Sequence, residues 1–258
     1  MSERIIAVVS DKGGVGKTTG ATSVAHGLAR RAARVLLVDF DLLGQDAIVL
    51  GMDPMPGVYE YFVRGAAASD VVCETGRPGL HLLPGNSWTR RADSDVRVTG
   101  MAALTESLRL LTQGYDFTVI DTHPSGYLQE LAIRVASVVV IPVRCEALAM
   151  DGVAATLQLV QAIGRPQQVV ILPTMYDERL NAHRYNYGLL RDAYPGRVAA
   201  PAPARVAVAE AHADGLTVWE YARRNELAPV RASYEQLLDW LMPDAGEALF
   251  GETEVVSW

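Results

Sequence analysis

The sequence predicts an α/β fold with a doubly wound, mostly parallel sheet flanked by helices. Three observations lead to this prediction: short apolar runs alternate with longer segments of helical period, several runs are almost continuously apolar, and a glycine-rich turn follows the first run. Strands that are covered on both faces lose the polar alternation of a half-exposed sheet. Alternating strands and helices imply right-handed crossovers, which place ligand sites at the carboxyl ends of the strands.

Six short runs rich in valine, isoleucine, leucine or phenylalanine are predicted to be strands. They are Ile5–Val9, Val35–Asp39, Leu80–Leu83, Phe117–Asp121, Val138–Val143 and Val169–Leu172. Apolar residues recur with a helical period in Thr18–Ala32, Met101–Thr112, Met150–Ile163 and Tyr234–Met242. We expect residues 1–242 to form one domain, because a chain of this size can bury a single large core. Residues 243–258 are expected to form a loosely held acidic tail.

The composition narrows the classes of function. No run approaches the roughly 20 apolar residues of a membrane-spanning helix, and the N-terminus lacks the pattern of a secretory signal, so we expect a cytoplasmic protein with no membrane partner. The formal net charge of −7 argues against bulk electrostatic binding of nucleic acid but is compatible with a local basic patch. Cys73 and Cys145 lack metal-ligand or redox spacing and are expected to be ordinary half-buried thiols.

Lysine is used in only one place in this chain. Of 23 basic residues, only Lys12 and Lys17 are lysines, and both lie in the glycine-rich turn. A lysine offers a compact ammonium on a thin stem, whereas the arginine used elsewhere offers a planar guanidinium. The turn is therefore predicted to need two small point charges, and two such charges facing an empty loop would only repel each other.

The glycine-rich turn has the context of a phosphate-binding loop. It follows a predicted strand and opens a helix, so backbone N–H groups and the helix N-terminus can converge on phosphate oxygens. Lys17 is expected to reach the terminal phosphates, the Thr18 hydroxyl to bind Mg²⁺, and Thr19 to contact the α-phosphate. The predicted nucleotide-binding residues are Lys12, Gly13, Gly14, Val15, Gly16, Lys17, Thr18 and Thr19. The alternative is a turn of this kind without a ligand.

The loop departs from the ordinary motif, which would have glycine in place of Asp11. Its extra lysine, Lys12, makes it resemble the deviant Walker A motif of the ParA/MinD family of partition and positioning ATPases, on the ParA-like branch. The resemblance implies a P-loop NTPase fold, ATP and Mg²⁺ as cofactors, and a homodimer that forms on ATP binding. It also implies that Lys12 reaches the partner's phosphates and that Lys12, Lys17 and Asp41 are catalytic.

Two predicted strands end in aspartates at positions that the family uses. The segment Val35–Asp41 resembles switch I, which implies that Asp41 positions the attacking water and meets Mg²⁺ through water, while Asp39 is a structural partner. The alternative for Asp41 is a solvated acid at the end of a strand. Tyr115–Asp121 resembles a Walker B strand, which implies that Asp121 holds a Mg²⁺-bound water.

Some neighbouring residues depart from the family pattern. Leu42 and Leu43 follow Asp41 where the family usually has proline and glutamine, so the geometry of this switch segment is left open. His123 follows the Walker B aspartate, and we expect it to be a packed or exposed histidine rather than a phosphate ligand. Met175 and Pro203 match residues that lie beside adenine in the family, although either could be a core or turn residue.

The predicted contact with DNA is also displaced. In chromosome-partition members an arginine precedes the Ala-Glu-Ala run, but the corresponding residue here is Ala207. Phosphate contacts need only cations on the correct face. The substitute contacts that we consider are Arg205, Arg223, Arg224 and Arg231, and the alternative is that they form a solvated surface.

The leading functional hypothesis is a ParA-like ATPase that dimerises on Mg·ATP and binds DNA without sequence preference. It would partition or position a plasmid, a chromosome or a protein cargo, with hydrolysis stimulated by a ParB-like protein or a cargo adaptor. One alternative is a MinD-like ATPase on a membrane surface, which an acidic tail disfavours because anionic lipid repels it. Another is a metabolic or electron-transfer P-loop ATPase, although the two cysteines do not match iron–sulfur positions.

Overall fold

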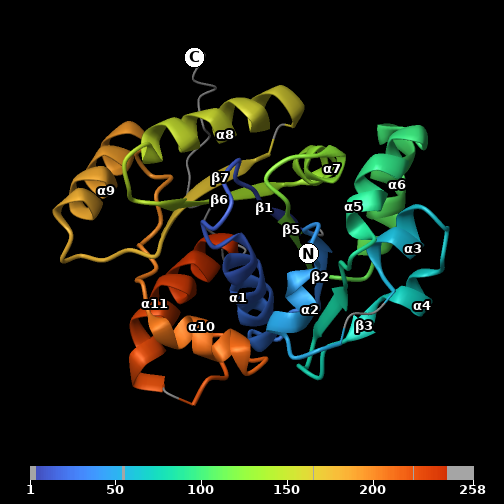
Figure 1. Cartoon of the computed structure of the whole chain (residues 1–258), viewed down its shortest axis with the longest axis horizontal. Helices are drawn as coiled ribbons and strands as arrows, with labels where there is room; N and C mark the ends of the chain where they lie inside the picture. The colour runs from blue at the N-terminus through green and yellow to red at the C-terminus, as the bar shows by residue number, and fades with distance from the viewer. Residues whose placement is uncertain (1–3, 54–55, 165, 223, 243–258) are drawn as a thin grey trace.

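The computed structural model describes residues 4–53, 56–164, 166–222 and 224–242, and the predicted acidic tail lies outside them. A seven-stranded sheet in the order β3-β4-β2-β5-β1-β6-β7 forms the centre of this described part (Figure 1). All its pairings are parallel except the short antiparallel pairing of β3 with β4. The strands are β1 (Arg4–Val8), β2 (Val35–Phe40), β3 (Cys73–Glu74), β4 (Leu80–Leu83), β5 (Phe117–Thr122), β6 (Val138–Arg144) and β7 (Gln168–Thr174).

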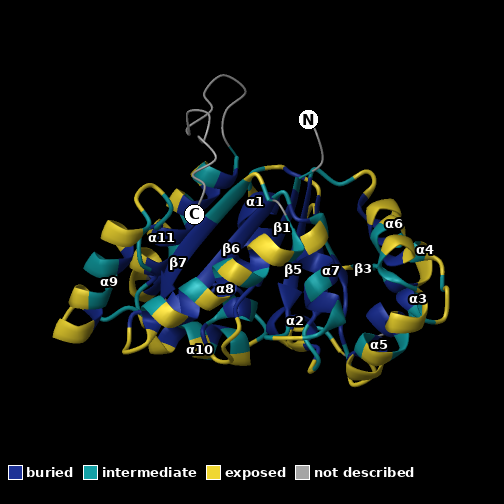
Figure 2. Ribbon diagram, turned by 90° about the horizontal axis from the view of Figure 1, so that it is seen from above, coloured by how far each residue is buried: buried dark blue, intermediate teal, exposed yellow. Residues whose placement is uncertain are grey.

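Helices cover both faces of the sheet. The helices are α1 (Lys17–Arg30), α2 (Gln45–Val49), α3 (Val58–Phe62), α4 (Ala68–Val71), α5 (Thr89–Asp95), α6 (Met101–Thr112), α7 (Tyr127–Val135), α8 (Ala149–Ile163), α9 (Asn181–Ala193), α10 (Val206–Ala213) and α11 (Arg224–Leu241), with a 3₁₀ turn at Val96–Val98. One face packs against α1, α2, α10 and α11, and the other packs against α3 to α9. The central strands are therefore buried on both sides, as Figure 2 shows, whereas the edge strand β3 is partly exposed.

The alternation of side chains along β1 explains its continuous apolar sequence. Ile6 and Val8 point into the core under α1 and α11, whereas Ile5 and Ala7 point into the opposite core. A strand between two helical layers is mostly apolar on both of its faces, because successive side chains point to opposite layers. The sequence prediction of a doubly wound, mostly parallel sheet is confirmed.

All six predicted strands and four predicted helices are present, but α11 is longer than expected. It begins at Arg224 rather than Tyr234 and contains Pro229. Proline removes a backbone donor from a helix interior, and the apolar residues Leu227 and Val230 that pack this first part against the core offset that loss. The two-residue strand β3 and the helices α2, α3, α4, α5, α7, α9 and α10 were not predicted. Among the described residues, no helix combines the length and the apolar character needed to cross a bilayer.

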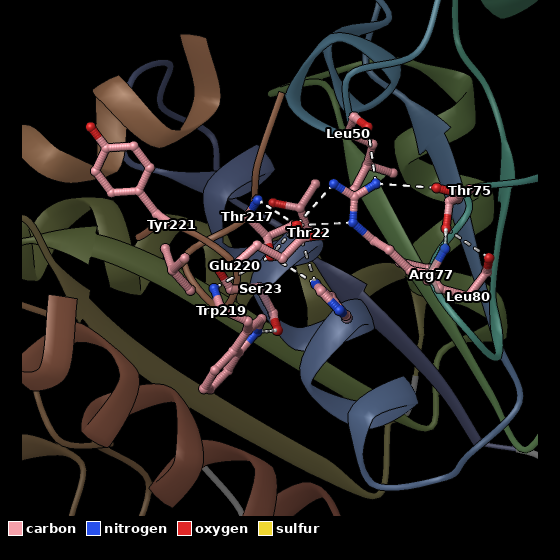
Figure 3. Close-up of polar contacts among 12 residues, drawn as sticks. Thr22, Ser23, Leu50, Thr75, Arg77, Leu80, Thr217, Trp219, Glu220 and Tyr221 are labelled. Carbon is pink, nitrogen blue, oxygen red and sulfur yellow. Dashed lines mark hydrogen bonds and ion pairs between the residues drawn. The ribbon is translucent and has the colours of Figure 1, made fainter. Parts of the chain in front are cut away.

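One arginine ties the β3–β4 turn to the loop between α10 and α11 (Figure 3). The Arg77 guanidinium donates hydrogen bonds to the carbonyl oxygens of Leu50 at 2.9 Å and Gly215 at 3.0 Å, and to the Glu220 carboxylate at 2.9 Å. Glu220 also accepts a hydrogen bond from the backbone N–H of Thr217 at 3.0 Å. The Arg77 side chain is only 9% exposed, so burial strengthens this charged contact. It joins segments that lie far apart in the sequence.

Candidate nucleotide site

The glycine-rich turn lies between β1 and α1, at the carboxyl end of the sheet's central strands. Gly14 and Gly16 have φ angles of 69° and 86°, which favour glycine over any residue with a side chain. A Cβ atom added at Gly13 or Gly14 would meet no other atom within 4 Å. The Thr174 hydroxyl donates a hydrogen bond of 2.7 Å to the carbonyl oxygen of Val15 and holds the turn against β7. The turn is therefore a fixed backbone cradle with open space beside it.

Lys17 opens α1 and is 7% exposed. Its Nζ donates a hydrogen bond of 3.0 Å to the carbonyl oxygen of Lys12, across the turn. Burial lowers the pKa of the Lys17 ammonium, and the carboxylates of Asp121 and Asp41 act in the opposite direction. An anion held in the turn would stabilise this buried charge further, so the position of Lys17 fits a phosphate ligand.

Thr18 and Asp121 form a polar pair beside the turn. The Thr18 hydroxyl donates a hydrogen bond of 2.7 Å to Oδ2 of Asp121, which lies on β5 and is fully buried. Burial raises the pKa of the Asp121 carboxyl to about 7, although the hydrogen bond from Thr18 opposes this shift. Hard oxygen ligands of this kind suit Mg²⁺, which commonly uses one or two protein oxygens together with phosphate and water. The pair therefore fits a nucleotide-bound Mg²⁺.

Asp39 and Asp41 have different surroundings at the end of β2. Asp39 is fully buried, and its carboxylate accepts hydrogen bonds from the backbone N–H groups of Asp41 at 2.9 Å and Asp46 at 3.0 Å. The Asp41 side chain is partly exposed, and its Oδ1 accepts a hydrogen bond of 2.8 Å from the N–H of Leu43. The carboxylate thus closes a turn that leaves Leu43 63% exposed. Asp39 orders this segment, and Asp41 is the acid that solvent can reach.

The two lysines of the turn point to different partners. Nζ of Lys12 donates a hydrogen bond of 3.1 Å to the carbonyl oxygen of Leu148, which precedes α8. Leu148 has a φ of 68° and is 66% exposed. The Lys12 side chain crosses Gly152, where an added Cβ would lie 3.1 Å from both Cε and Nζ of the lysine. Glycine at this position in α8 therefore makes room for Lys12.

A cavity of about 1300 Å³ adjoins the turn and has both predicted adenine-side residues in its wall. Met175 follows β7 with a φ of 49°, and its Cε lies 3.9 Å from the position of a Cβ added at Gly16. Pro203 pairs with Tyr176 through an isolated β-bridge. Gly16 and Thr19 also line the cavity, so its wall is continuous with the phosphate turn. Met175, Pro203 and part of the phosphate turn therefore line the same cavity.

The predicted DNA-facing arginines are not equivalent. Arg205 is exposed just before α10, and its guanidinium donates a hydrogen bond of 2.7 Å to the carbonyl oxygen of Ala204. The guanidinium of Arg231 is half-buried and donates hydrogen bonds to the carbonyl oxygens of Val218 at 2.6 Å and Tyr221 at 3.0 Å. Arg231 therefore anchors α11 to the preceding loop.

The remaining candidates are placed as follows. Arg223 and the side chain of Arg224 lie outside the described residues. Ala207, which replaces the family's arginine, is buried at 1% exposure.

His123 contacts the backbone of Ser125 in a local turn, as expected for a packed or exposed histidine. Cys145 is fully buried rather than half-buried, and burial raises the pKa of its thiol to about 12.

Three residues near the site were missed in the sequence. Leu148 supplies the carbonyl that holds Lys12, Thr174 fixes the turn, and Asp46 adds a third buried acid beside Asp39 and Asp121. Thr174 directly precedes Met175, and only Met175 was assigned to the adenine side from the sequence. Nothing in the local sequence distinguishes Leu148, whose contact with Lys12 spans 136 residues, or Asp46, which only the fold brings to Asp121.

Comparison with known proteins assigns the chain to a family. A family model described as an AAA domain matches residues 3–170. The chromosome-partitioning ATPase Soj of Thermus thermophilus is 36% identical over 253 residues, which make up 95% of this chain and 98% of that protein. This identity extends over nearly the whole of both chains.

Two solved structures agree with the fold. The septum site-determining protein MinD of Pyrococcus horikoshii, complexed with Mg-ADP, has a TM-score of 0.77 at 22% identity, covering 95% of this chain and 98% of that chain. A cobyrinic acid a,c-diamide synthase of Mycobacterium smegmatis, with bound ADP and magnesium, has a TM-score of 0.74 at 29% identity, covering 93% and 96%. From the phosphate turn, the sheet order and the similarity to Soj together, we conclude that this chain belongs to the ParA/MinD family of P-loop ATPases.

Proposed function

We propose that the protein is a ParA-like partition or positioning ATPase that binds Mg·ATP, dimerises on the nucleotide and hydrolyses it. The observation that carries this proposal is the pair of lysines in one backbone cradle, with the Thr18–Asp121 pair beside it. The similarity to a chromosome-partitioning ATPase over nearly the whole chain supports it. The base would lie in the adjoining cavity beside Met175 and Pro203.

Each residue of the proposed site has a separate role that follows from its position. Lys17 holds the terminal phosphates, and the Thr18 hydroxyl with the Asp121 carboxylate holds the cation and its water. Mg²⁺ supplies neutralisation of the charge that develops on the transferred phosphoryl group. Asp41 orients the attacking water, because it is the strand-end acid that solvent reaches. Chemistry of this kind depends mainly on positioning and preorganised charge.

Lys12 provides the link between ATP and the dimer. Its Nζ is held only by the carbonyl of Leu148 in the described part of the chain, and the side chain is exposed. A charge-assisted bond to phosphate is stronger than a bond to a carbonyl oxygen. We therefore propose that Lys12 leaves Leu148 and stabilises the partner's phosphates when two subunits close face to face.

DNA is the proposed surface on which the ATP-bound dimer acts, and the protein would then associate with the nucleoid. Arg205 carries this proposal among the described residues, because it is exposed and bonded only to a neighbouring carbonyl. The protein partner of the ATPase is proposed to be a ParB-like protein or a cargo adaptor that stimulates hydrolysis.

The test is binding to a random-sequence DNA duplex with ATP, with ADP and without nucleotide, each across a salt series. We expect binding with ATP only, falling steeply with salt because phosphate contacts release counterions. Arg205→Ala should lower the salt slope by about two, because each subunit of the dimer loses one phosphate contact that contributes about one. Arg134→Ala, which removes an exposed arginine on α7 at the opposite face of the sheet, should leave the slope unchanged. The absence of DNA binding in every nucleotide state would refute the DNA part of the proposal.

A small-molecule ATP-dependent ligase is the second candidate, because the synthase from M. smegmatis is 29% identical over most of this chain. The two functions differ in what completes the site. A partition ATPase needs a second copy of the chain, so its ATPase rate should rise with protein concentration. A ligase would instead show a rate per chain that is independent of concentration.

A further inference from the structure

Three carboxylates meet in the interior behind the phosphate turn. Asp39 and Asp121 are register partners on the neighbouring strands β2 and β5, and Asp46 lies in α2, which follows β2. One oxygen from each of the three lies within 4.8 Å of the others, and all three residues are fully buried. We call this group the carboxylate triad. It contains a residue, Asp46, that the proposed hydrolysis does not use.

The triad has unused ligand atoms. Neither oxygen of Asp46 has a hydrogen-bond partner among the described residues, and Oδ1 of Asp121 has none either. Asp39 accepts one hydrogen bond at each of its oxygens, from the N–H groups of Asp41 and Asp46. Carboxylates that are buried without partners are costly, because both the charge and the lone pairs lose their contact with water. This arrangement points to a ligand that accepts several carboxylate oxygens at once.

Among the described residues, side-chain cations balance the charge of the triad only at Asp121. Burial and the neighbouring carboxylates hold the pKa of Asp46 well above its ordinary value, and no lysine or arginine opposes that shift. Lys17 lowers the pKa of Asp121, but this cation does not act on Asp39 or Asp46. A negative group of this density therefore needs either protons or a metal ion.

Backbone rather than side chains forms the wall beside Asp39. A Cβ added at Gly85 would lie 2.9 Å from Cγ of Asp39 and 2.8 Å from its carbonyl oxygen. A Cβ added at Gly44, which has a φ of 63°, would lie 2.4 Å from the carbonyl carbon and oxygen of Gly85. These two glycines bring the turn after β2 against the turn after β4, and they keep that space free of side chains.

The separation of the oxygens suits a hard divalent cation. Metal–oxygen distances are about 2.0–2.1 Å for Mg²⁺ and about 2.3–2.6 Å for Ca²⁺, so ligands on opposite sides of such an ion lie about 4–5 Å apart. The triad falls within this limit. We propose that Asp39, Asp46 and Asp121 bind a second divalent cation of the Mg²⁺, Mn²⁺ or Ca²⁺ class, distinct from the nucleotide-bound Mg²⁺ beside Thr18 and independent of nucleotide.

Asp121 connects the two sites. Its Oδ2 accepts the Thr18 hydrogen bond on the nucleotide side, while its Oδ1 is available to the triad. The second ion holds the end of β2, and therefore the turn that carries Asp41, in a fixed place relative to the phosphate turn. Its role is structural positioning, because Asp39 holds the backbone N–H of Asp41 and neither Asp39 nor Asp46 is itself assigned to the nucleotide.

The test is Mn²⁺ titration of the nucleotide-free, metal-stripped full chain, with free Mn²⁺ followed by electron paramagnetic resonance. We expect one bound Mn²⁺ per chain, displaced by excess Mg²⁺ or Ca²⁺. Asp46→Asn should weaken Mn²⁺ binding at least tenfold. Asp53→Asn, which alters an exposed acid seven residues further along the chain, should change it less than twofold. Thr18→Ala should retain nucleotide-free Mn²⁺ binding within about threefold, because its hydroxyl belongs to the nucleotide site.

Thermal unfolding gives a second measurement, which begins with the wild-type chain alone. Saturating Mn²⁺ should raise the midpoint of the wild-type chain without nucleotide. For Asp46→Asn the midpoint in EDTA should equal or exceed that of the wild type, and Mn²⁺ should no longer raise it. The proposal is overturned if wild type binds no Mn²⁺ at millimolar concentration, if Asp46→Asn binds as tightly as wild type, or if Thr18→Ala alone abolishes binding. None of these results depends on ATP, so they are separate from the proposed function.

Discussion

Nζ of Lys12 lies 3.1 Å from the carbonyl oxygen of Leu148 in its own chain. The lysine that distinguishes this phosphate turn is therefore held beside α8, away from Lys17. Gly152 makes that position possible, because any larger residue would place a Cβ against the lysine.

Gly152→Ala should loosen this resting contact. The added methyl meets only the flexible end of Lys12, so the chain should fold, with the gain of about 1 kcal/mol that alanine gives over glycine in a helix. A displaced Lys12 should favour ATP-dependent dimerisation, measured as a lower midpoint concentration by light scattering. Gly188→Ala in α9, where nothing lies within 4 Å of the added Cβ, is the matched control. Equal dimerisation of the two variants would contradict the resting role of Leu148.

Lys17→Ala should abolish nucleotide binding. The substitution removes the buried ammonium that faces the cradle and leaves the Lys12 carbonyl without its donor. Binding of a fluorescent ATP analogue should weaken at least a hundredfold. Lys12→Ala is the control within the same turn, and it should retain nucleotide binding while losing ATP-dependent dimerisation. Comparable loss of binding in both variants would mean that the two lysines do not have separate roles.

Asp41→Asn should separate binding from hydrolysis. Asparagine keeps an acceptor for the N–H of Leu43, so the turn should persist, but the charge that orients water is lost. We expect nucleotide affinity within a fewfold of wild type, at least a tenfold slower phosphate release, and a dimer that persists in ATP. The full native rate of hydrolysis in Asp41→Asn would exclude the water-positioning role.

His26→Gln should reduce the loss of stability on mild acidification. Burial lowers the pKa of His26 to about 4 from 6.5; Glu220 opposes the shift, whereas Arg77 and Arg30 add to it. The unfolded chain therefore takes up this proton at higher pH than the folded chain, so stability falls as the pH drops from 6.5 toward 4. The effect is on the order of 3 kcal/mol at most.

The measurement for His26 is urea unfolding of both proteins at several pH values. Burial raises the pKa of Asp121 to about 7, so protonation of this carboxyl favours the folded chain as the pH falls. Both proteins contain Asp121, so the difference in stability between the variant and the wild type reports His26 alone. The wild type should lose more stability than His26→Gln between pH 6.5 and 4. Parallel pH profiles would show that His26 is not the responsible group.

The central fold could be predicted because its strands are buried on both faces. Val35–Phe40 and Phe117–Thr122 contain long apolar runs, and only two helical layers can cover such strands. Helix α9 was missed because most of its residues are polar or tyrosine, and only His183 and Leu190 are buried. Helix α10 was missed because apolar residues lie on all its sides, so the sequence shows no preferred face.

The phosphate turn could be predicted because its chemistry is local, whereas the rest of the site depends on distant segments. Gly13 to Thr18 form the cradle within one short stretch of chain. The contacts of Leu148 with Lys12 span 136 residues, and those of Thr174 with Val15 span 159. Asp46 resembles any acid in the first turn of a helix, where negative charge is favoured, and only the fold places it beside Asp39 and Asp121.

The Thr174 hydroxyl lies at a junction of three chain segments. It is within hydrogen-bonding distance of the carbonyl oxygens of Val15 in the phosphate turn, at 2.7 Å, and of Val143 at the end of β6, at 3.2 Å. Met175, on the rim of the large cavity, is the next residue along the chain. In the proposed site the phosphates would lie at the turn and the base at the rim of the cavity. Thr174 and Met175 are consecutive, so the two ends of the nucleotide would contact segments that a single pair of residues connects.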